Sequence, residues 1–327
     1  MQKIKGISSD SRSIKDGYIF VAINGLQKDG NDYINEAISN GAKLIISDKK
    51  TIKSTSYDKP VLIVEDAREY LAKIIADFYH NPSHRLNLIG VTGTNGKTTI
   101  THLIYNLLNY KKKKAGIIGT VKVDTKKDLY KGILTTPKTE DLQKFLKEML
   151  DNNLKYCAME VSSHGIKLKR IAYCNFALKI ASNITSDHLD LHRNIKEYIN
   201  VKKSFLKDTS DTPVLINQDN KILASFSKLC KNQINYSINK NTCVRAENIK
   251  KNNNQIEYTY ALKKDLIFKD KVIKQKEFKI KMNLYGQHNI YNSLAAITTA
   301  LYFGLDYKTI QNFFKDYNGV WRRFEII

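Results

Sequence analysis

The first 80 residues of the chain alternate short apolar runs with segments in which apolar residues recur at helical spacing. Short apolar runs are typical of buried strands, and amphipathic segments are typical of helices packed on a sheet. One helical segment ends before Gly41, and glycine commonly follows a helix C-terminus. The pattern predicts a small α/β unit, with strands at 18–23, 43–47 and 61–64 and helices at 34–40 and 68–79.

A polar joint at 80–84, with the sequence HNPSH, follows the last of these helices. Pro82 disfavours helical backbone in the residue before it, so the helix should end here. We therefore expect an N-terminal domain of residues 1–84 and a second domain of residues 85–327. A chain of 327 residues is long enough for two domains, each with a core of its own.

From residue 85 onward, apolar runs and amphipathic segments follow each other as strand, helix, strand. This order is typical of a mostly parallel sheet with helices on its faces. Residues 233–284 differ, because their polar and apolar side chains alternate, which predicts a small antiparallel sheet. The predicted strands are 86–91, 115–118, 156–161, 176–180 and 214–216, and the predicted helices are 100–109, 139–152, 198–206, 289–303 and 309–317.

A glycine-rich loop separates the predicted strand 86–91 from the helix that follows, and residues 90–99 read GVTGTNGKTT. Such a loop presents backbone N–H groups to phosphates at a helix N-terminus. Lys97 would add a positive charge at the terminal phosphates, and the Thr98 hydroxyl would ligate Mg²⁺. The general phosphate-loop pattern has a glycine where this chain has Val91, but the strand–loop–helix order favours nucleoside triphosphate binding over a chance glycine turn. The loop residues expected at the nucleotide are Gly93, Thr94, Asn95, Gly96, Lys97, Thr98 and Thr99.

Two further segments place polar side chains after predicted strands. Glu160 lies near the end of the run 156–161, and parallel sheets bind ligands at the carboxyl ends of their strands. Burying a carboxylate costs several kcal/mol unless a cation compensates, so we expect Glu160 to ligate Mg²⁺ rather than to face water. His188 and His192 have the i,i+4 spacing of a helical zinc site, but no third zinc ligand is evident, and we place His188 beside Mg²⁺.

The formal net charge is +22, from 54 Lys and Arg against 32 Asp and Glu. Most of the excess is lysine spread along the chain, and arginine, which recognises bases and phosphates, is scarce, so no nucleic-acid partner is expected. No apolar run approaches the roughly 20 residues that a bilayer requires, and the N-terminus lacks a signal-peptide pattern. The four dispersed cysteines suit a reducing compartment. We expect a cytoplasmic monomer without a membrane partner, whose positive field attracts anionic substrates.

These motifs together resemble the Mur ligases, an ATP-dependent amide-forming family of peptidoglycan synthesis. Within the family the resemblance is greatest to the MurE type, which extends UDP-N-acetylmuramoyl-L-alanyl-D-glutamate. The matching segments run in family order over the whole chain: Asp10-Ser11-Arg12, the loop 93–99, Thr135-Thr136-Pro137, 160–165 (EVSSHG), Asn183 with 187–190 (DHLD), Gly286 with Asn289 and Asn292, and Arg323 with Glu325.

The resemblance implies an α/β fold, with a small N-terminal UDP-sugar-binding domain before a phosphate-loop-type central ATPase domain that has a mostly parallel sheet and a small antiparallel sheet. It implies that the D-Glu carboxylate of the UDP-MurNAc-dipeptide takes the γ-phosphoryl group of ATP. The amine of a diamino acid, meso-diaminopimelate or L-lysine, then forms the amide. A C-terminal Rossmann-like domain, which selects that amino acid in the family, is absent from the 327 residues. A non-catalytic nucleotide- or UDP-sugar-binding fragment and another amide ligase of the superfamily remain as alternatives.

Site residues follow from the resemblance position by position. Lys202 matches a lysine that CO₂ converts to a carbamate at the metal site, with the adjacent Lys203 as the alternative. The residues expected in catalysis are Lys97, Glu160, His188 and Lys202, and those expected around Mg²⁺ are Thr98, Glu160, His188 and carbamylated Lys202. Asn289, Asn292 and Arg323 join the loop as ATP contacts. The expected substrate contacts are Ser11, Leu26, Gln27 and Lys28 for the UDP part, and Thr135, Thr136, Ser162 and Arg170 for the muramoyl peptide.

Overall fold

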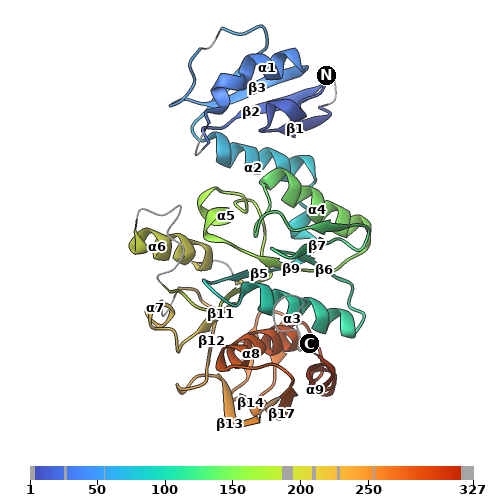
Figure 1. The fold of residues 1–327 in the computed structure, drawn as a ribbon, viewed down its shortest axis with the longest axis vertical. Coiled ribbons are helices and arrows are strands. Elements are labelled where there is room, and N and C mark those ends of the chain that lie inside the picture. The colour runs from blue at the N-terminus through green and yellow to red at the C-terminus, as the bar shows by residue number, and fades with distance from the viewer. Residues whose placement is uncertain are drawn as a thin grey trace. The chain divides into compact units, whose positions relative to one another are not determined.

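A computed structural model describes residues 4–25, 28–54, 56–185, 194–207, 211–226, 229–252 and 255–317. Contacts between Cα atoms divide the chain into two compact units (Figure 1). Unit 1 consists of Met1–Pro82, Pro137–Phe145 and Leu168–Cys174. Unit 2 consists of Ser83–Thr136, Leu146–Lys167 and Asn175–Ile327. Two segments from later in the chain thus belong to unit 1 together with its first 82 residues.

Unit 1 contains a four-stranded parallel sheet with a helix on each face. Its strands, in spatial order, are β1 (Gly6–Ser8), β2 (Tyr18–Ala22), β3 (Ala42–Asp48) and β4 (Val61–Val64), and its helices include α1 (Ile34–Ser39) and α2 (Ala67–Phe78). Successive side chains of β2 point to opposite faces. Phe20 and Ala22 pack in one cluster with α1, whereas Ile19 and Val21 pack in another with α2. The α/β pattern predicted for this part of the chain is confirmed.

Unit 2 is built on an 11-stranded sheet. In spatial order its strands are β17 (Lys276–Met282), β14 (Gln255–Leu262), β13 (Val244–Asn252), β12 (Gln233–Ser237), β11 (Val214–Asn217), β10 (Leu178–Ala181), β5 (Asn87–Thr92), β9 (Tyr156–Glu160), β6 (Ala115–Ile118), β7 (Lys122–Asp124) and β8 (Leu129–Lys131). The strands from β13 to β6 pair in parallel, and those at both edges pair antiparallel. The predicted mostly parallel sheet with a smaller antiparallel part is confirmed.

The antiparallel part begins later in the chain than the sequence pattern predicts. β12 is the first strand within 233–284, but it pairs in parallel with β11 and with β13. The chain crosses from β11 through the short helix α7 (Lys221–Ala224) instead of turning in a hairpin, and a crossover connection returns the strand in the same direction. The antiparallel strands β13, β14 and β17 continue this same sheet.

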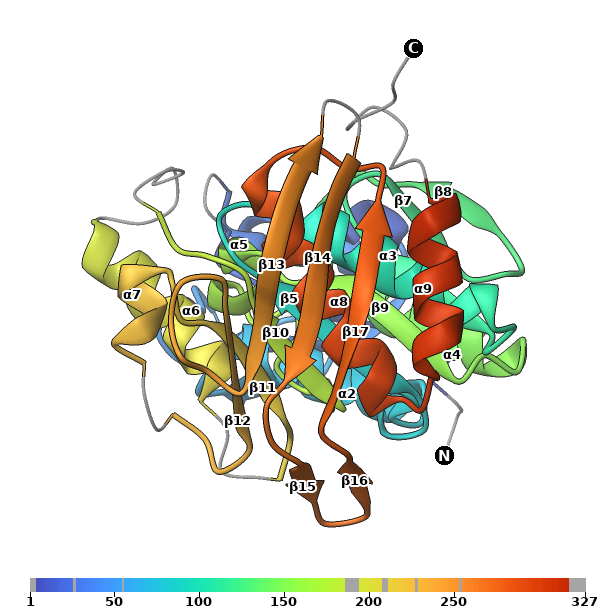
Figure 2. The ribbon, with the colours of Figure 1, turned by 90° about the horizontal axis from the view of Figure 1, so that it is seen from below.

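The helices of unit 2 complete its core. They are α3 (Lys97–Tyr110), α4 (Thr139–Asp151, shared with unit 1), α5 (Ser163–Lys167), α6 (Ile195–Leu206), α7, α8 (Gln287–Tyr302) and α9 (Tyr307–Asp316). Figure 2 shows β13, β14 and β17 side by side with α8 behind them. Hydroxyl contacts join this sheet to α8, because Tyr258 OH lies 2.7 Å from Ser293 Oγ and Tyr260 OH lies 3.0 Å from Thr298 Oγ1. Within the described ranges, none of the helices has the length and apolar character needed to span a bilayer.

The packing predicts different costs for two leucines of unit 2. Leu103 of α3 is fully buried, whereas Leu129 of β8 is 71% exposed. Leu103→Ala should lower the free energy of unfolding by about 2–5 kcal/mol, because it leaves a cavity in the core. Leu129→Ala should change it by less than about 0.5 kcal/mol. Urea unfolding followed by circular dichroism measures both values, and equal losses would contradict the assigned burial.

Candidate functional site

The loop between β5 and α3 can adopt its path only with glycine at two positions. Gly96 has φ +85°, and a Cβ atom there would lie 2.6 Å from Asn292 Oδ1. A Cβ atom on Gly93 would overlap Ser182 Oγ. From the end of β10, the Ser182 hydroxyl donates to Asn95 O at 2.5 Å, and the Asn95 N–H donates to Asn183 Oδ1 at 2.9 Å. The loop is therefore held in place by protein contacts, with α3 beginning directly after it at Lys97.

Lys97 lies across this loop. Its Nζ donates to Gly93 O and to Thr94 O, each at 2.9 Å. The ammonium group therefore stays at the beginning of α3, where the unpaired N–H groups of the first helical turn also attract anions. The geometry supports the expected role of Lys97 as a charge for phosphate groups.

Glu160, at the end of β9, is 1% exposed and accepts three hydrogen bonds. Its Oε1 accepts from the Thr120 N–H at 2.9 Å, and its Oε2 accepts from the hydroxyls of Thr98 and Thr120, each at 3.1 Å. Burial raises the pKa of Glu160, and these hydrogen bonds together with the charge of Lys97 act in the opposite direction. Ionised Glu160 therefore gains from any further cation that reaches it.

The residues around Glu160 fit Mg²⁺ better than zinc. Thr98 Oγ1 and Glu160 Oε2 are 3.1 Å apart, close to the roughly 3 Å between neighbouring ligands of Mg²⁺ held at about 2.1 Å. Across the described part of the chain, no group of three or more His, Cys, Asp or Glu side chains could hold a metal. One carboxylate and one hydroxyl suit an ion that takes its other ligands from water and phosphate.

Helix α6 buries one of two adjacent lysines. Lys202 is 1% exposed, and its Nζ donates to Gly93 O at 2.9 Å and lies 4.8 Å from the centre of the Tyr198 ring. Burial and the like charge of Lys97 hold the pKa of Lys202 well below its usual value. Lys203 is exposed. The difference follows from helical spacing, because Tyr198, Lys202 and Leu206 recur every four residues on the buried face.

The three expected peptide contacts of unit 2 lie at the same edge of the sheet. The Thr136 hydroxyl donates to Glu160 O at 3.0 Å and accepts from the Ser162 N–H at 2.9 Å. Thr135 Oγ1 accepts from the Thr120 hydroxyl at 3.1 Å. Thr135, Thr136 and Ser162 thus connect to Glu160 through hydrogen bonds, and the structure brings together residues that the sequence separates widely.

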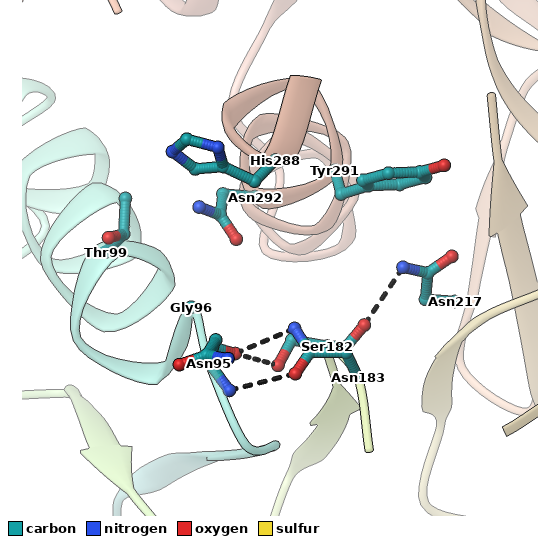
Figure 3. A pocket seen from close by; sticks show the side chains of 9 residues that line it. All are labelled: Asn95, Gly96, Thr99, Ser182, Asn183, Asn217, His288, Tyr291 and Asn292. Carbon is teal, nitrogen blue, oxygen red and sulfur yellow. Dashed lines mark hydrogen bonds between the residues drawn. The ribbon is translucent and has the colours of Figure 1, made fainter. Parts of the chain in front are cut away.

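A pocket of about 260 Å³ lies beside the loop, which contributes Asn95 and Gly96 to its lining (Figure 3). It is lined by Asn95, Gly96, Thr99, Ser182, Asn183, Asn217, His288, Tyr291 and Asn292. Rings and amides of this kind suit a flat heterocycle with polar edges. Asn289 is fully buried and accepts from Asn292 Nδ2 at 3.0 Å, so it supports the pocket from behind. Burial lowers the pKa of His288, which favours its neutral ring.

Unit 1 has a larger pocket of about 710 Å³. Three predicted substrate contacts line it: Ser11, Lys28 and Arg170. The Ser11 hydroxyl donates to Glu36 Oε2 at 2.7 Å. Arg68 also lines this pocket. Burial lowers the pKa of Arg170, and the like charge of Arg68 lowers the pKa further. Two partly desolvated guanidinium groups near each other favour an anionic ligand.

Sequence reasoning missed Thr120 and Arg68. Thr120 follows the predicted strand 115–118, but this position alone does not distinguish it from a turn residue. No local sequence pattern identifies Arg68, because Arg170, which lines the same pocket, is distant in the sequence. The predicted site residues Leu26, Gln27, His188 and Arg323 lie outside the described residues.

Comparison with known families finds a match of residues 91–300 to the middle domain of Mur ligases. Residues 3–79 match the catalytic domain of the Mur ligase family. A solved structure of a UDP-N-acetylmuramoyl-L-alanyl-D-glutamate–2,6-diaminopimelate ligase superposes with a TM-score of 0.80 at 22% identity, and covers 98% of this chain and 64% of its own.

Two curated ligases of the same name are more similar in sequence. The ligase of Clostridium botulinum is 36% identical over 100% of this chain and 65% of its own length. The ligase of Caldanaerobacter subterraneus subsp. tengcongensis is 35% identical over 94% of this chain and 61% of its own length. The chain therefore spans less than two thirds of the length of these relatives.

The surroundings of Glu160 predict how the protein responds to Mg²⁺. Mg²⁺ with a non-hydrolysable ATP analogue should raise the thermal unfolding midpoint by about 5 °C at saturation. Glu160→Gln should abolish the part of this rise that requires Mg²⁺. Burial raises the pKa of Glu160, so its ionisation in the folded protein lowers the stability once the pH exceeds the ordinary pKa of a glutamate. Without Mg²⁺, the Glu160→Gln variant should therefore have a thermal unfolding midpoint no lower than that of the wild type.

Glu257→Gln is the matched control, because Glu257 is partly exposed on β14 and pairs with Lys281 at 3.5 Å. Differential scanning fluorimetry with Mg²⁺ or with EDTA measures all three proteins. An undiminished Mg²⁺ response in the Glu160 variant would contradict the assignment.

Proposed function

This chain belongs to the Mur ligase family, and we propose that it supplies the ATP-binding and UDP-sugar-binding parts of an ATP-dependent ligase. The proposed reaction joins a diamino acid to the D-Glu carboxylate of UDP-MurNAc-L-Ala-D-Glu during peptidoglycan precursor synthesis. The names of the relatives support 2,6-diaminopimelate over L-lysine as that amino acid. The observation that carries the proposal is that Lys97, Glu160 and Thr135 converge on one edge of the unit 2 sheet.

The proposed reaction has two steps in which the protein positions its reactants. A D-Glu carboxylate oxygen attacks the γ-phosphorus of ATP, the bond to ADP breaks, and an acyl phosphate forms. The amine of the diamino acid then attacks the acyl carbon, phosphate leaves, and the nitrogen loses its proton. Lys97 and the loop N–H groups would hold the transferring phosphoryl group. Thr98 and Glu160 would hold Mg²⁺, which would supply positive charge to neutralise the phosphate groups.

The buried amine of Lys202 supports carbamate formation at this position. A depressed pKa leaves more of the amine neutral, and only the neutral amine can attack CO₂. The new N–C bond releases one proton and converts the side chain to an anion. This anion would serve as a metal ligand together with His188, as the family resemblance implies.

For unit 1, we propose that its pocket holds the UDP-sugar part of the substrate. Arg68, Arg170 and Lys28 line one cavity, and their charges suit the diphosphate. Ser11, which is buried with its hydroxyl on Glu36, suits a polar edge of the uridine or sugar. Unit 2 would then hold ATP and the peptide end.

Calorimetric titration of the 327-residue chain with UDP-MurNAc-L-Ala-D-Glu tests this substrate. We expect micromolar binding, weakened about tenfold or more by Arg170→Ala, because a hydrogen-bonded charge pair is lost. Arg85→Ala is the control, since Arg85 is an exposed arginine before β5 and should leave the affinity unchanged. If the folded wild-type chain binds none of this ligand, the proposed substrate is wrong for this chain.

Carbamate formation has a spectroscopic test. In ¹³C-bicarbonate buffer, the wild-type chain should give a carbamate carbonyl signal by NMR. Lys203→Arg should keep the signal, because Lys203 is exposed, and Lys202→Met should lose it. A signal that survives in the Lys202 variant and disappears in the Lys203 variant would assign the carbamate to the other lysine.

A further inference from the structure

Thr120 has one hydroxyl proton and two acceptors for it. Its Oγ1 lies 3.1 Å from Glu160 Oε2 and 3.1 Å from Thr135 Oγ1, and it is the donor in both contacts. A hydroxyl carries a single proton, so it can donate fully to one of the two acceptors at a time. The Thr120 side chain therefore has two hydrogen-bonded states that differ only in rotation of the hydroxyl.

The occupancy of Glu160 Oε2 decides between these states. This oxygen already accepts from Thr98 Oγ1 and from Thr120 Oγ1, and a carboxylate oxygen has about two lone-pair directions. Oε2 is also the Glu160 oxygen that accepts the Thr98 hydroxyl, so a cation held by Thr98 and Glu160 would take Oε2. Cation binding turns the Thr98 proton away from Oε2, and the charge of the cation then repels the Thr120 proton on the same oxygen and weakens that bond. The other protein acceptor that the Thr120 proton can reach is Thr135 Oγ1.

We propose that Thr120 is a positioning residue that couples divalent-cation binding at Glu160 to substrate binding at Thr135. When the Thr120 proton turns to Thr135 Oγ1, that oxygen becomes an acceptor, and the proton of Thr135 is directed to a partner other than Thr120. An anionic oxygen of the peptide substrate is the partner that gains most from this donor. The inference rests on the proposed function, because it takes Thr135 as a contact of that substrate.

The surrounding backbone leaves the hydroxyl as the part that moves. Gly119 has no room for a side chain, since a Cβ atom there would overlap Glu160 Oε1, and its N–H donates to Lys122 O at 3.1 Å. The Thr120 N–H holds Glu160 Oε1 at 2.9 Å in either state. Because Thr120 itself is exposed, its hydroxyl can rotate without repacking the core.

A coupling role and a structural role give different results when Thr120 loses its hydroxyl. If the hydrogen bond of Thr120 is only structural, its loss should weaken the binding of each ligand by the same factor, whether or not the other ligand is bound. A coupling residue changes the ratio of substrate affinities with and without the cation, and linkage requires the reciprocal ratio to change equally. The ratio is therefore the quantity to measure.

The experiment uses the 327-residue chain with the non-hydrolysable ATP analogue AMP-PNP. Calorimetry gives the Kd of UDP-MurNAc-L-Ala-D-Glu with the analogue plus Mg²⁺ and with the analogue plus EDTA. For the wild type, Mg²⁺ should tighten substrate binding about tenfold, the scale of one hydrogen bond to a charged group. For Thr120→Val, which keeps the shape and the N–H bond, the ratio should fall to about one.

Three further measurements keep the test sharp. Thr120→Ser should restore the ratio, because serine retains the hydroxyl. Thr242→Val should behave as the wild type, because the Thr242 hydroxyl donates a hydrogen bond to Val244 O at the start of β13, outside this network. The Kd of Mg²⁺ with the analogue should stay within about threefold in Thr120→Val, because its backbone N–H still holds Glu160. If a melting curve shows that the Thr120→Val variant is unfolded, Thr120→Ala replaces it.

A wild-type ratio retained in Thr120→Val, or no Mg²⁺ effect on substrate binding by the wild type, would overturn the coupling role while leaving the proposed function intact. A folded wild-type chain that binds the analogue but never the muramoyl dipeptide would overturn the proposed substrate, and the coupling role with it. The two failures are therefore distinguishable.

Discussion

Glu160 is an ionisable side chain at the end of a strand that is buried on both faces, and its charge there costs free energy unless nearby groups compensate. The chain meets this constraint with hydrogen bonds from Thr98 and Thr120 and with the charge of Lys97. Lys97 and Thr98 begin α3 after β5, and Thr120 follows β6, so these groups come from two connections at the carboxyl edge of the sheet. Gly119 follows from the same constraint, because any side chain there would occupy the space of the carboxylate. The ligand edge of unit 2 is thus arranged around one carboxylate.

Two lysines add a second electrostatic constraint beside it. Lys97 and Lys202 both donate to the carbonyl oxygen of Gly93, each at 2.9 Å. Their like charges oppose each other, which contributes to the low pKa of Lys202. A phosphate chain at the loop would relieve this repulsion, and so would the proposed conversion of Lys202 to an anion. The loop, the metal site and the buried lysine therefore respond to ligands as one electrostatic unit.

The sequence predicted the parts of this arrangement that depend on local pattern. The strand before the loop, the helix after it and the buried face of 198–206 all have periodic signals, and the structure has β5, α3 and α6 at these places. Lys202 turned inward because helical spacing put it on the face of Tyr198. The sequence pattern also placed Glu160 near the end of a buried strand, and Glu160 is the last residue of β9.

The remaining parts depend on pairings between distant segments, which no local pattern records. The crossover through α7 makes β12 parallel, although its alternating side chains resemble those of an antiparallel strand. Arg68 lines a pocket with Arg170 only because the segment Leu168–Cys174 joins unit 1. Thr120 follows a four-residue strand, and a lone threonine after a short strand is not distinguishable from a turn residue until Glu160 is placed beside it.

The abundance of hydroxyls at this edge has a physical reason. A second carboxylate beside Glu160 would repel it, and a third amine would add to the repulsion between Lys97 and Lys202. A hydroxyl carries no charge and can either donate or accept. Thr98 can satisfy the carboxylate in the free protein and then turn its oxygen to a cation, and Thr120 can pass its proton from one acceptor to another. Such groups let the site stay fully hydrogen-bonded before a ligand arrives, so that binding exchanges partners without leaving a buried polar atom unpaired.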